Sequence, residues 1–381
     1  MKHLLLTALM HCTLLAIAHP TNEHILNIND GLSDNFVSSI CQDANGYMWF
    51  ATELGANRFD GSKFTPFYKG QINGNELNRV IANGSEVYIA TQRYGLSVFN
   101  CNTETFSSFS HTNGAISADD ITDLCADMAG NVWISYYWEG LDCLNSLDNT
   151  ITHYNVDNLN GLGGNQIWAV AADSHGLVYV GHVNSGMTVI DPVKHQAQNY
   201  RCVPSDPTTL PDDQVYAILP DTRGGVWVGT NAGLAYFING NFIRVSQLSG
   251  RIKCMRQMPD GSLWVGIENG GISVVRANGI FSSVGSLEIE PLHLDGLDNI
   301  TVSDINTDSF GNIWIATFGS GIYFISHREP AIKQWSMATD DLSWRVAWGM
   351  TVDRNNNVWV GTDGGGFDIF HDNQRIAHLD K

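Results

Sequence analysis

The segment Asp43-Ala44-Asn45-Gly46-Tyr47-Met48-Trp49-Phe50-Ala51-Thr52 sets a pattern that recurs through the chain. Its Asp-x-x-Gly motif is typical of a hairpin turn, where glycine is favoured because the turn needs a positive φ. Val37 to Gln42 and Tyr47 to Thr52 flank this turn and are predicted to form two antiparallel strands. Asn57 to Asp60 and Phe64 to Tyr68 add a third and a fourth strand, so one repeat makes a four-stranded sheet.

Eight such repeats follow one another, each marked by an aromatic residue in its second strand. We expect these residues to pack between neighbouring sheets as anchors: Trp49, Tyr88, Trp133, Tyr179, Trp227, Trp264, Trp314 and Trp359. Their mean spacing, about 44 residues, lies in the range of a propeller blade. A chain with 43% hydrophobic residues, 15% charged residues and 38 glycines also suits many short strands. We predict an all-β protein, a β-propeller of eight four-stranded blade repeats.

The sequence allows two arrangements of the blades in a closed ring. A strand at His24 to Ile28 precedes the first repeat and could complete the last blade. In the preferred arrangement, residues 19–330 form repeats one to seven of a closed ring, and residues 331–381 form an eighth repeat that begins a second propeller. In the other arrangement eight blades form a single ring, and either His24 to Ile28 or Gln374 to Leu379 supplies the last outer strand.

The first 18 residues are predicted to be a signal peptide. Lys2 provides a positive start, Leu4 to Ala18 is apolar, and Ala16-Ile17-Ala18 resembles a cleavage site. We therefore expect a periplasmic or secreted protein. No later apolar run reaches membrane-spanning length, so the mature chain is predicted to have no membrane span. The net charge of −19 argues against a nucleic acid partner.

Six cysteines follow the predicted leader, scattered through expected strands: Cys41, Cys101, Cys125, Cys143, Cys202 and Cys254. Their even number fits an oxidising compartment, but their spacing favours buried free thiols and leaves any pairing open. Neither the cysteines nor the 13 histidines have the spacing of a metal site. We predict no metal and no cofactor.

The opening of the first repeat resembles the two-component regulator propellers. The resemblance rests on Gly31-Leu32-Ser33-Asp34-Asn35-Phe36-Val37, the Asp43 to Gly46 turn, Trp49-Phe50-Ala51-Thr52 and Arg58-Phe59-Asp60-Gly61. It implies the periplasmic sensor region of a hybrid histidine kinase, usually two seven-bladed rings followed by an immunoglobulin-like module.

The same resemblance implies a ligand and partners. It implies an oligosaccharide or another small ligand, and a homodimer or a membrane-bound kinase as partner. No stretch here resembles a phosphoacceptor, an ATP-binding box or a receiver domain, so we expect no kinase activity from this chain. It is similar to a truncated or split sensor, or to a free-standing relative.

Candidate ligand-binding residues lie in loops that follow strand two or precede strand one, because these loops gather around the channel of a propeller. The candidates are Arg93, Tyr94, Tyr136, Tyr137, Trp138, Glu139, Trp168, Arg251, Trp344 and Arg345. The run Tyr136 to Glu139 places three aromatic residues and a carboxylate where other repeats have small residues, which suits a sugar ring. The alternative is a loop that packs on its neighbour or on a partner domain.

The predicted function is non-catalytic ligand sensing in a two-component system. Glu53, Glu139, Glu268 and Asp363 could converge as glycosidase carboxylates, but no local motif singles out a pair. A streptogramin lyase-like or carbohydrate-active propeller enzyme is one alternative, and a protein-interaction propeller is another.

Overall fold

The computed structural model describes residues 23–277, 287–327, 335, 342–371 and 374–380. Within these residues the chain forms eight four-stranded antiparallel sheets and one short 3-10 turn, η1 (Ile28–Asp30). It divides into two compact units, Met1–His327 and Arg328–Lys381. The predicted signal peptide lies outside the described residues.

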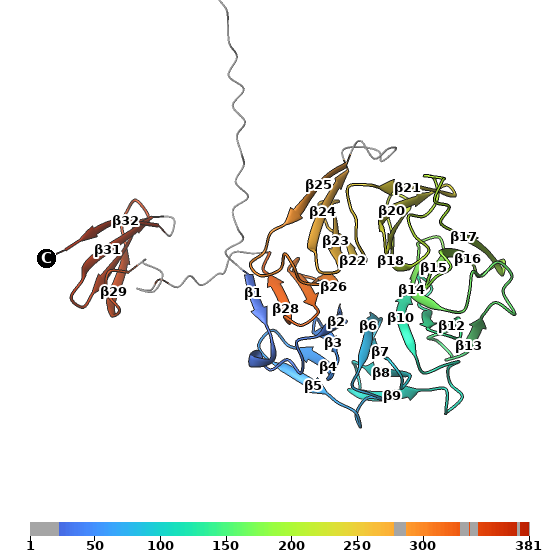
Figure 1. Ribbon diagram of the computed structural model, residues 1–381. Helices are drawn as coiled ribbons and strands as arrows, with labels where there is room; N and C mark the ends of the chain where they lie inside the picture. The colour runs from blue at the N-terminus through green and yellow to red at the C-terminus, as the bar shows by residue number, and fades with distance from the viewer. Residues whose placement is uncertain (1–22, 278–286, 328–334, 336–341, 372–373, 381) are drawn as a thin grey trace, which may run out of the picture. The chain divides into compact units, whose positions relative to one another are not determined.

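The first unit contains seven sheets, here called blades one to seven, arranged as a ring (Figure 1). Blade one comprises β2 (Val37–Gln42), β3 (Met48–Thr52), β4 (Gly55–Phe59) and β5 (Phe64–Phe67). Blade two comprises β6 (Leu77–Asn83), β7 (Glu86–Thr91), β8 (Leu96–Asn100) and β9 (Thr105–Phe109). Blade three comprises β10 (Ile121–Ala126), β11 (Val132–Tyr136), β12 (Leu141–Leu144) and β13 (Ile151–Tyr154). Blade four comprises β14 (Ile167–Ala172), β15 (Val178–His182), β16 (Met187–Asp191) and β17 (Gln196–Tyr200).

The remaining blades of the ring follow the same order. Blade five comprises β18 (Val215–Pro220), β19 (Val226–Thr230), β20 (Gly233–Ile238) and β21 (Asn241–Val245). Blade six comprises β22 (Ile252–Gln257), β23 (Leu263–Ile267), β24 (Gly271–Ala277) and β25 (Leu287–Leu292). Blade seven comprises β26 (Val302–Thr307), β27 (Ile313–Thr317), β28 (Ile322–Ile325) and β1 (Glu23–Leu26).

The ring closes through a strand from the start of the chain. β1 pairs antiparallel with β28, so that Glu23 lies opposite Ile325, and β2 contacts β26. This is the seven-bladed alternative. The strand ends at Leu26 and does not reach Ile28 as predicted, because the Asn27 side chain accepts the Asn29 N–H and starts η1. Gly31, with φ of 101°, ends that turn.

The repeated Asp-x-x-Gly turn and its aromatic residue are joined by a hydrogen bond. In five repeats the tryptophan indole N–H donates to the aspartate six residues earlier, at 2.8–3.1 Å: Trp49, Trp133, Trp227, Trp314 and Trp359. Tyr179 donates its hydroxyl proton to Asp173 in the same way, and Tyr88 donates to Glu86. Trp264 differs because Met258 replaces the turn aspartate. The motif therefore ties the hairpin turn to the side chain that enters the core.

The core of the ring lies between adjacent blades. Trp49 is fully buried in a cluster with Val80 and Ile89 of blade two, and its ring stacks on Phe67. Ile40, on the opposite face of blade one, packs with Trp314 of blade seven. Each ring blade thus has two buried faces. The six described cysteines are free thiols, and burial raises the pKa of Cys101 to about 11.

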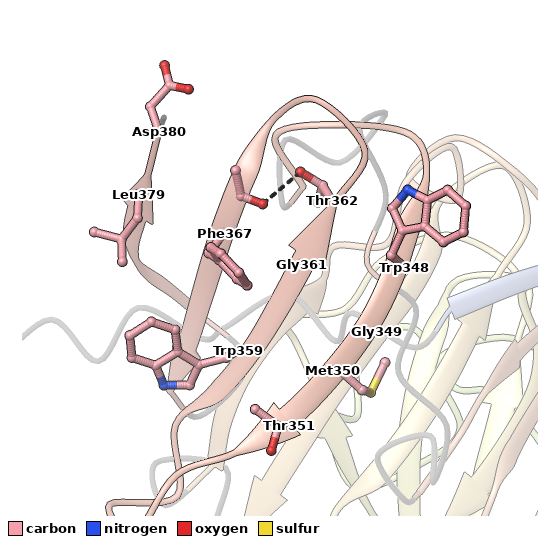
Figure 2. Close-up of a pocket in the computed structure, with 11 residues that line it drawn as sticks. Trp348, Gly349, Met350, Thr351, Trp359, Gly361, Thr362, Phe367, Leu379 and Asp380 are labelled. Carbon is pink, nitrogen blue, oxygen red and sulfur yellow. Dashed lines mark hydrogen bonds between the residues drawn. The ribbon is translucent and has the colours of Figure 1, made fainter.

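The second unit contains blade eight: β29 (Ala347–Val352), β30 (Val358–Thr362), β31 (Gly366–His371) and β32 (Gln374–Leu379). All six residues of β29 are exposed, including Trp348 at 76% and Met350 at 70%. A hollow of about 700 Å³ lies over its sheet, lined by Trp359, Phe367 and Leu379 among others (Figure 2). Blade eight has the strand pattern of a ring blade but not its burial.

Candidate ligand site at the channel mouth

A β-bulge begins the innermost strand of every blade. In each, the pairing with the second strand skips one residue just after the first pair, as between Val37 and Ser39 in blade one. The skipped residues all lie five positions before the turn residue of their repeat: Ser38, Asn78, Thr122, Trp168, Tyr216, Lys253, Ser303 and Trp348. A bulge leaves its extra residue unpaired and redirects its side chain.

The seven bulge residues of the ring line one pocket of about 350 Å³. The pocket is bounded by the innermost strands, which surround the centre of the ring in Figure 1, and we call it the channel mouth. Four of the seven side chains are small or polar, whereas blades four, five and six contribute Trp168, Tyr216 and Lys253. The mouth therefore has one large-residue wall, built by three consecutive blades.

An aromatic row forms this wall and continues outward. The rings of Trp168 and Tyr216 are stacked with centroids 5.9 Å apart. Tyr137 meets Trp168 edge-on at 5.2 Å, and Trp138 meets Tyr137 edge-on at 4.9 Å. Trp138 is 59% exposed, so the row leads from the pocket to the surface of blade three. Such a row offers flat apolar faces to a ligand ring.

Two cations flank Tyr216. The Arg251 guanidinium lies 4.8 Å from the Tyr216 ring centroid and donates to Glu268 at 2.9 Å and to Asn231 at 3.2 Å. The Lys253 ammonium lies 5.4 Å from the same centroid. Burial lowers the pKa of Lys253, opposed by the nearby Glu268 carboxylate. Among the described residues, no carboxylate lies within ion-pair distance of the Lys253 ammonium.

The opposite side of the mouth combines aromatic and polar side chains. Phe36 and Phe318, from blades one and seven, pack edge-on at 4.6 Å. Glu53 and Gln92 also line the pocket, and Glu53 is exposed. Hydrogen-bonding groups therefore face the aromatic wall across the pocket, as polar groups do in many small-molecule sites.

Arg79 forms the floor, one residue deeper along its strand than Asn78. Its Nη1 lies 3.5 Å from Asp304 Oδ2, and its Nε lies 3.0 Å from Asp123 Oδ1 without the alignment of a hydrogen bond. Burial would lower the pKa of Arg79, but the two carboxylates raise it. Asp304 also accepts the Ile40 N–H, and Asp123 accepts the Val170 N–H. The floor thus links blades one, two, three, four and seven.

Of the ten predicted site residues, some lie at the mouth or in its aromatic row and others do not. Trp168 lines the mouth, Tyr137 and Arg251 contact its wall, and Trp138 continues the row. Glu139 is exposed next to Trp138. Tyr136 is a correction: it is fully buried and donates its hydroxyl proton to Asp142, because strand alternation turns it away from Tyr137.

Four other predicted residues do not line the mouth. Tyr94 lies under the Lys69 ammonium at 4.8 Å, and Arg93 is exposed beside it. Trp344 and Arg345 belong to the second unit. The prediction omitted Tyr216 and Lys253, although both lie at the position of Trp168 in their repeats.

One cluster has the composition of a catalytic triad but not its geometry. Ser117 Oγ and Asp142 Oδ1 both contact His153 through the same nitrogen, Nδ1, at 2.9 and 2.7 Å. A triad needs the serine and the carboxylate on different nitrogens. In blade eight Asp368 likewise accepts the Ser343 hydroxyl proton and contacts His378 Nδ1, which indicates a structural role within the repeat. No group of metal-binding side chains is found in the described part of the chain.

Comparisons with known proteins agree with this architecture. The family model described as two component regulator propeller matches residues 31–53 and 209–232, at the starts of blades one and five. The extracellular domain of a hybrid two-component system from B. thetaiotaomicron is 31% identical with a TM-score of 0.70. Two repeats of the chain thus match the two-component regulator propeller model, and the chain as a whole is similar to the extracellular domain of a hybrid two-component system.

The coverage of this family match is partial. The first B. thetaiotaomicron domain is matched over 94% of this chain and 49% of its own length, so the chain spans about half of it. A second such domain from B. thetaiotaomicron, 20% identical with a TM-score of 0.63, is matched over 92% of this chain and 45% of its own length.

Virginiamycin B lyase from Staphylococcus aureus shares the fold alone. It is 13% identical with a TM-score of 0.61, over 79% of this chain and 98% of the lyase. A comparison with curated protein sequences gave no significant match. In the part of the chain that the structure describes, no helix has the length and apolar character that crossing a membrane requires.

Proposed function

We propose that this propeller is the extracytoplasmic sensor part of a two-component system and binds a saccharide at the channel mouth without catalysis. The supporting observation is the asymmetric ring of bulge residues. Aromatic side chains from blades four and five form a stacked wall, and polar groups face it. Saccharides combine apolar ring faces with many hydroxyl groups, which is the chemistry that such a pocket complements.

The signalling partner is also part of the proposal. The solved relative at 31% identity is the extracellular domain of a hybrid two-component system. By analogy, the sensor would act as a homodimer or together with a membrane-bound kinase, and a predicted signal peptide would direct it to the periplasm or outside the cell.

We further propose that residues 331–381 are the first blade of a second ring. The face of blade eight with Trp359, Phe367 and Leu379 corresponds to the face of blade one with Trp49, Ala56 and Phe67. In blade one this face is buried by blade two. A following blade on the hollow of Figure 2 would bury the corresponding side chains in the same way.

The experiment for the saccharide site is a thermal-shift screen of the full chain against oligosaccharides. A ligand that binds only the folded state raises the melting temperature by mass action. We expect a saturable rise that Trp168→Ala and Tyr216→Ala abolish. Trp348→Ala is the matched control, because Trp348 occupies the same bulge position in blade eight. A shift that survives both mouth substitutions would refute the site, and no shift with any saccharide would refute saccharide sensing.

A further inference from the structure

We infer that the saccharide recognised at the channel mouth is acidic, and that its carboxylate or sulfate pairs with Lys253. This inference rests on the proposed function and concerns the same site. It follows from how the charged groups around the mouth are already partnered.

The other two cations at the mouth have carboxylate partners. Arg251 is held by Glu268, and Arg79 lies between Asp123 and Asp304. Arg251 thereby balances Glu268 on blade six, whereas at the floor one arginine is shared by two carboxylates. Lys253 is the cation of the described mouth residues that makes no ion pair: its ammonium lies over the Tyr216 ring, and the nearby Glu268 carboxylate is paired with Arg251.

At the position of Lys253, an anion stabilises the ammonium more than water does. Its side chain is half-buried, and a partly desolvated ammonium gains more from an opposite charge than an exposed one does. A charge-assisted hydrogen bond is also stronger than a neutral one. A ligand carboxylate that meets Lys253 would restore the electrostatic stabilisation that the ammonium has lost on burial.

The neighbouring aromatic wall selects the rest of the ligand. Lys253 follows Trp168 and Tyr216 in consecutive blades, so a sugar ring against the stacked pair could direct an acidic substituent to blade six. Glu53 also lines the mouth and has no ion-pair partner among the described residues. It is exposed and lies on blade one, beyond blade seven. It can remain hydrated, and its repulsion of an anion is weakened by solvent.

The test uses matched pairs of saccharides in calorimetric titrations of the full chain. Oligogalacturonates are compared with neutral galacto-oligosaccharides of equal length, and a sulfated chondroitin disaccharide with its unsulfated form. One pair isolates the carboxylate and the other the sulfate. We expect the acidic member of at least one pair to bind at least about tenfold more tightly, as one charged hydrogen bond allows.

The variants locate the effect. Lys253→Met should remove the preference for the acidic member, because the charge contact is lost. Lys69→Met is the matched control: Lys69 also lies over a tyrosine ring but does not line the mouth, and the preference should persist. Circular dichroism melting confirms that each variant is folded.

The outcomes separate the two proposals. Binding of neutral saccharides with no preference for acidic ones would overturn this inference and leave saccharide sensing intact. A preference that survives Lys253→Met would also overturn it. Absence of binding by every saccharide would overturn both.

Discussion

Blade one and blade eight share a sequence pattern but differ in burial. Ile40 in blade one is 2% exposed, whereas Met350, at the same position in blade eight, is 70% exposed. Trp49 is fully buried, while Trp359 is only partly covered, although both donate to a turn aspartate. The pattern within one repeat therefore determines the four-stranded sheet and its hairpin turn.

Burial of the sheet faces depends on the neighbouring repeat. A four-stranded sheet has two faces, and in a repeat protein both are covered by adjacent units. Most of the stability of the ring should therefore come from contacts between blades. The two regions can be separated experimentally by making equivalent changes in each.

The largest effect is expected from removing the closing strand. A chain that starts at Asn27 lacks β1 and exposes the edge of β28, and it should destabilise the ring by about 5 kcal/mol, from four residues of strand pairing and the partial burial of Leu26. Urea unfolding followed by circular dichroism measures this loss. Deletion of residues 374–381, the outer strand of blade eight, is the control and should leave the ring transition unchanged. An unchanged midpoint on loss of β1 would show that the ring does not depend on it.

Truncation of the anchors should give the next largest effect. Trp49→Ala removes a fully buried indole between blades one and two, and should cost about 4 kcal/mol in unfolding free energy. Trp359→Ala should cost the chain much less, because its indole is only partly covered. The same urea titrations measure both.

A third variant separates packing from the turn hydrogen bond. Trp49→Phe keeps most of the apolar area but loses the bond to Asp43, and should cost less than Trp49→Ala. Equal losses for Trp49→Ala and Trp359→Ala would contradict the claim that neighbouring blades provide the stability.

The smallest effect concerns pH in blade eight. Hydrogen bonds from Asn357 and Trp359 lower the pKa of Asp353 from 3.8 to about 2. Because the folded pKa is depressed, this stabilisation is complete above the unfolded value and is lost as the pH falls toward about 2. The NMR signal of the Trp359 indole N–H should shift over this range. Asp353→Asn removes the titrating group and should abolish that shift; a signal that still titrates would assign it to another group.

Much of the fold could be predicted because its signals are local. The Asp43 to Gly46 turn and the anchor Trp49 lie within ten residues of each other, and Val37 to Gln42 is the strand that was predicted. The end of β1 was predicted at Ile28, two residues beyond its actual end at Leu26. The capping role of Asn27 depends on a side-chain hydrogen bond that strand alternation does not reveal.

The site was harder to predict because bulges interrupt the alternation. Tyr136 and Tyr137 are adjacent and chemically alike, but one is buried in its sheet and the other meets Trp168. Tyr216 and Lys253 were not among the predicted site residues, although they lie at the position of Trp168 in their repeats. Aligning the repeats on the turn residue would have found them, five positions before it.

The bulge gives the propeller a position that can vary without disturbing its architecture. Because the skipped residue takes no part in the pairing of its sheet, exchanging it leaves the hairpin and the anchor in place. Seven such positions, one from each blade of the ring, surround the pocket that we propose as the ligand site. In this chain the seven residues are Ser38, Asn78, Thr122, Trp168, Tyr216, Lys253 and Ser303. A combinatorial library at these positions would be a direct route to sensors for new ligands.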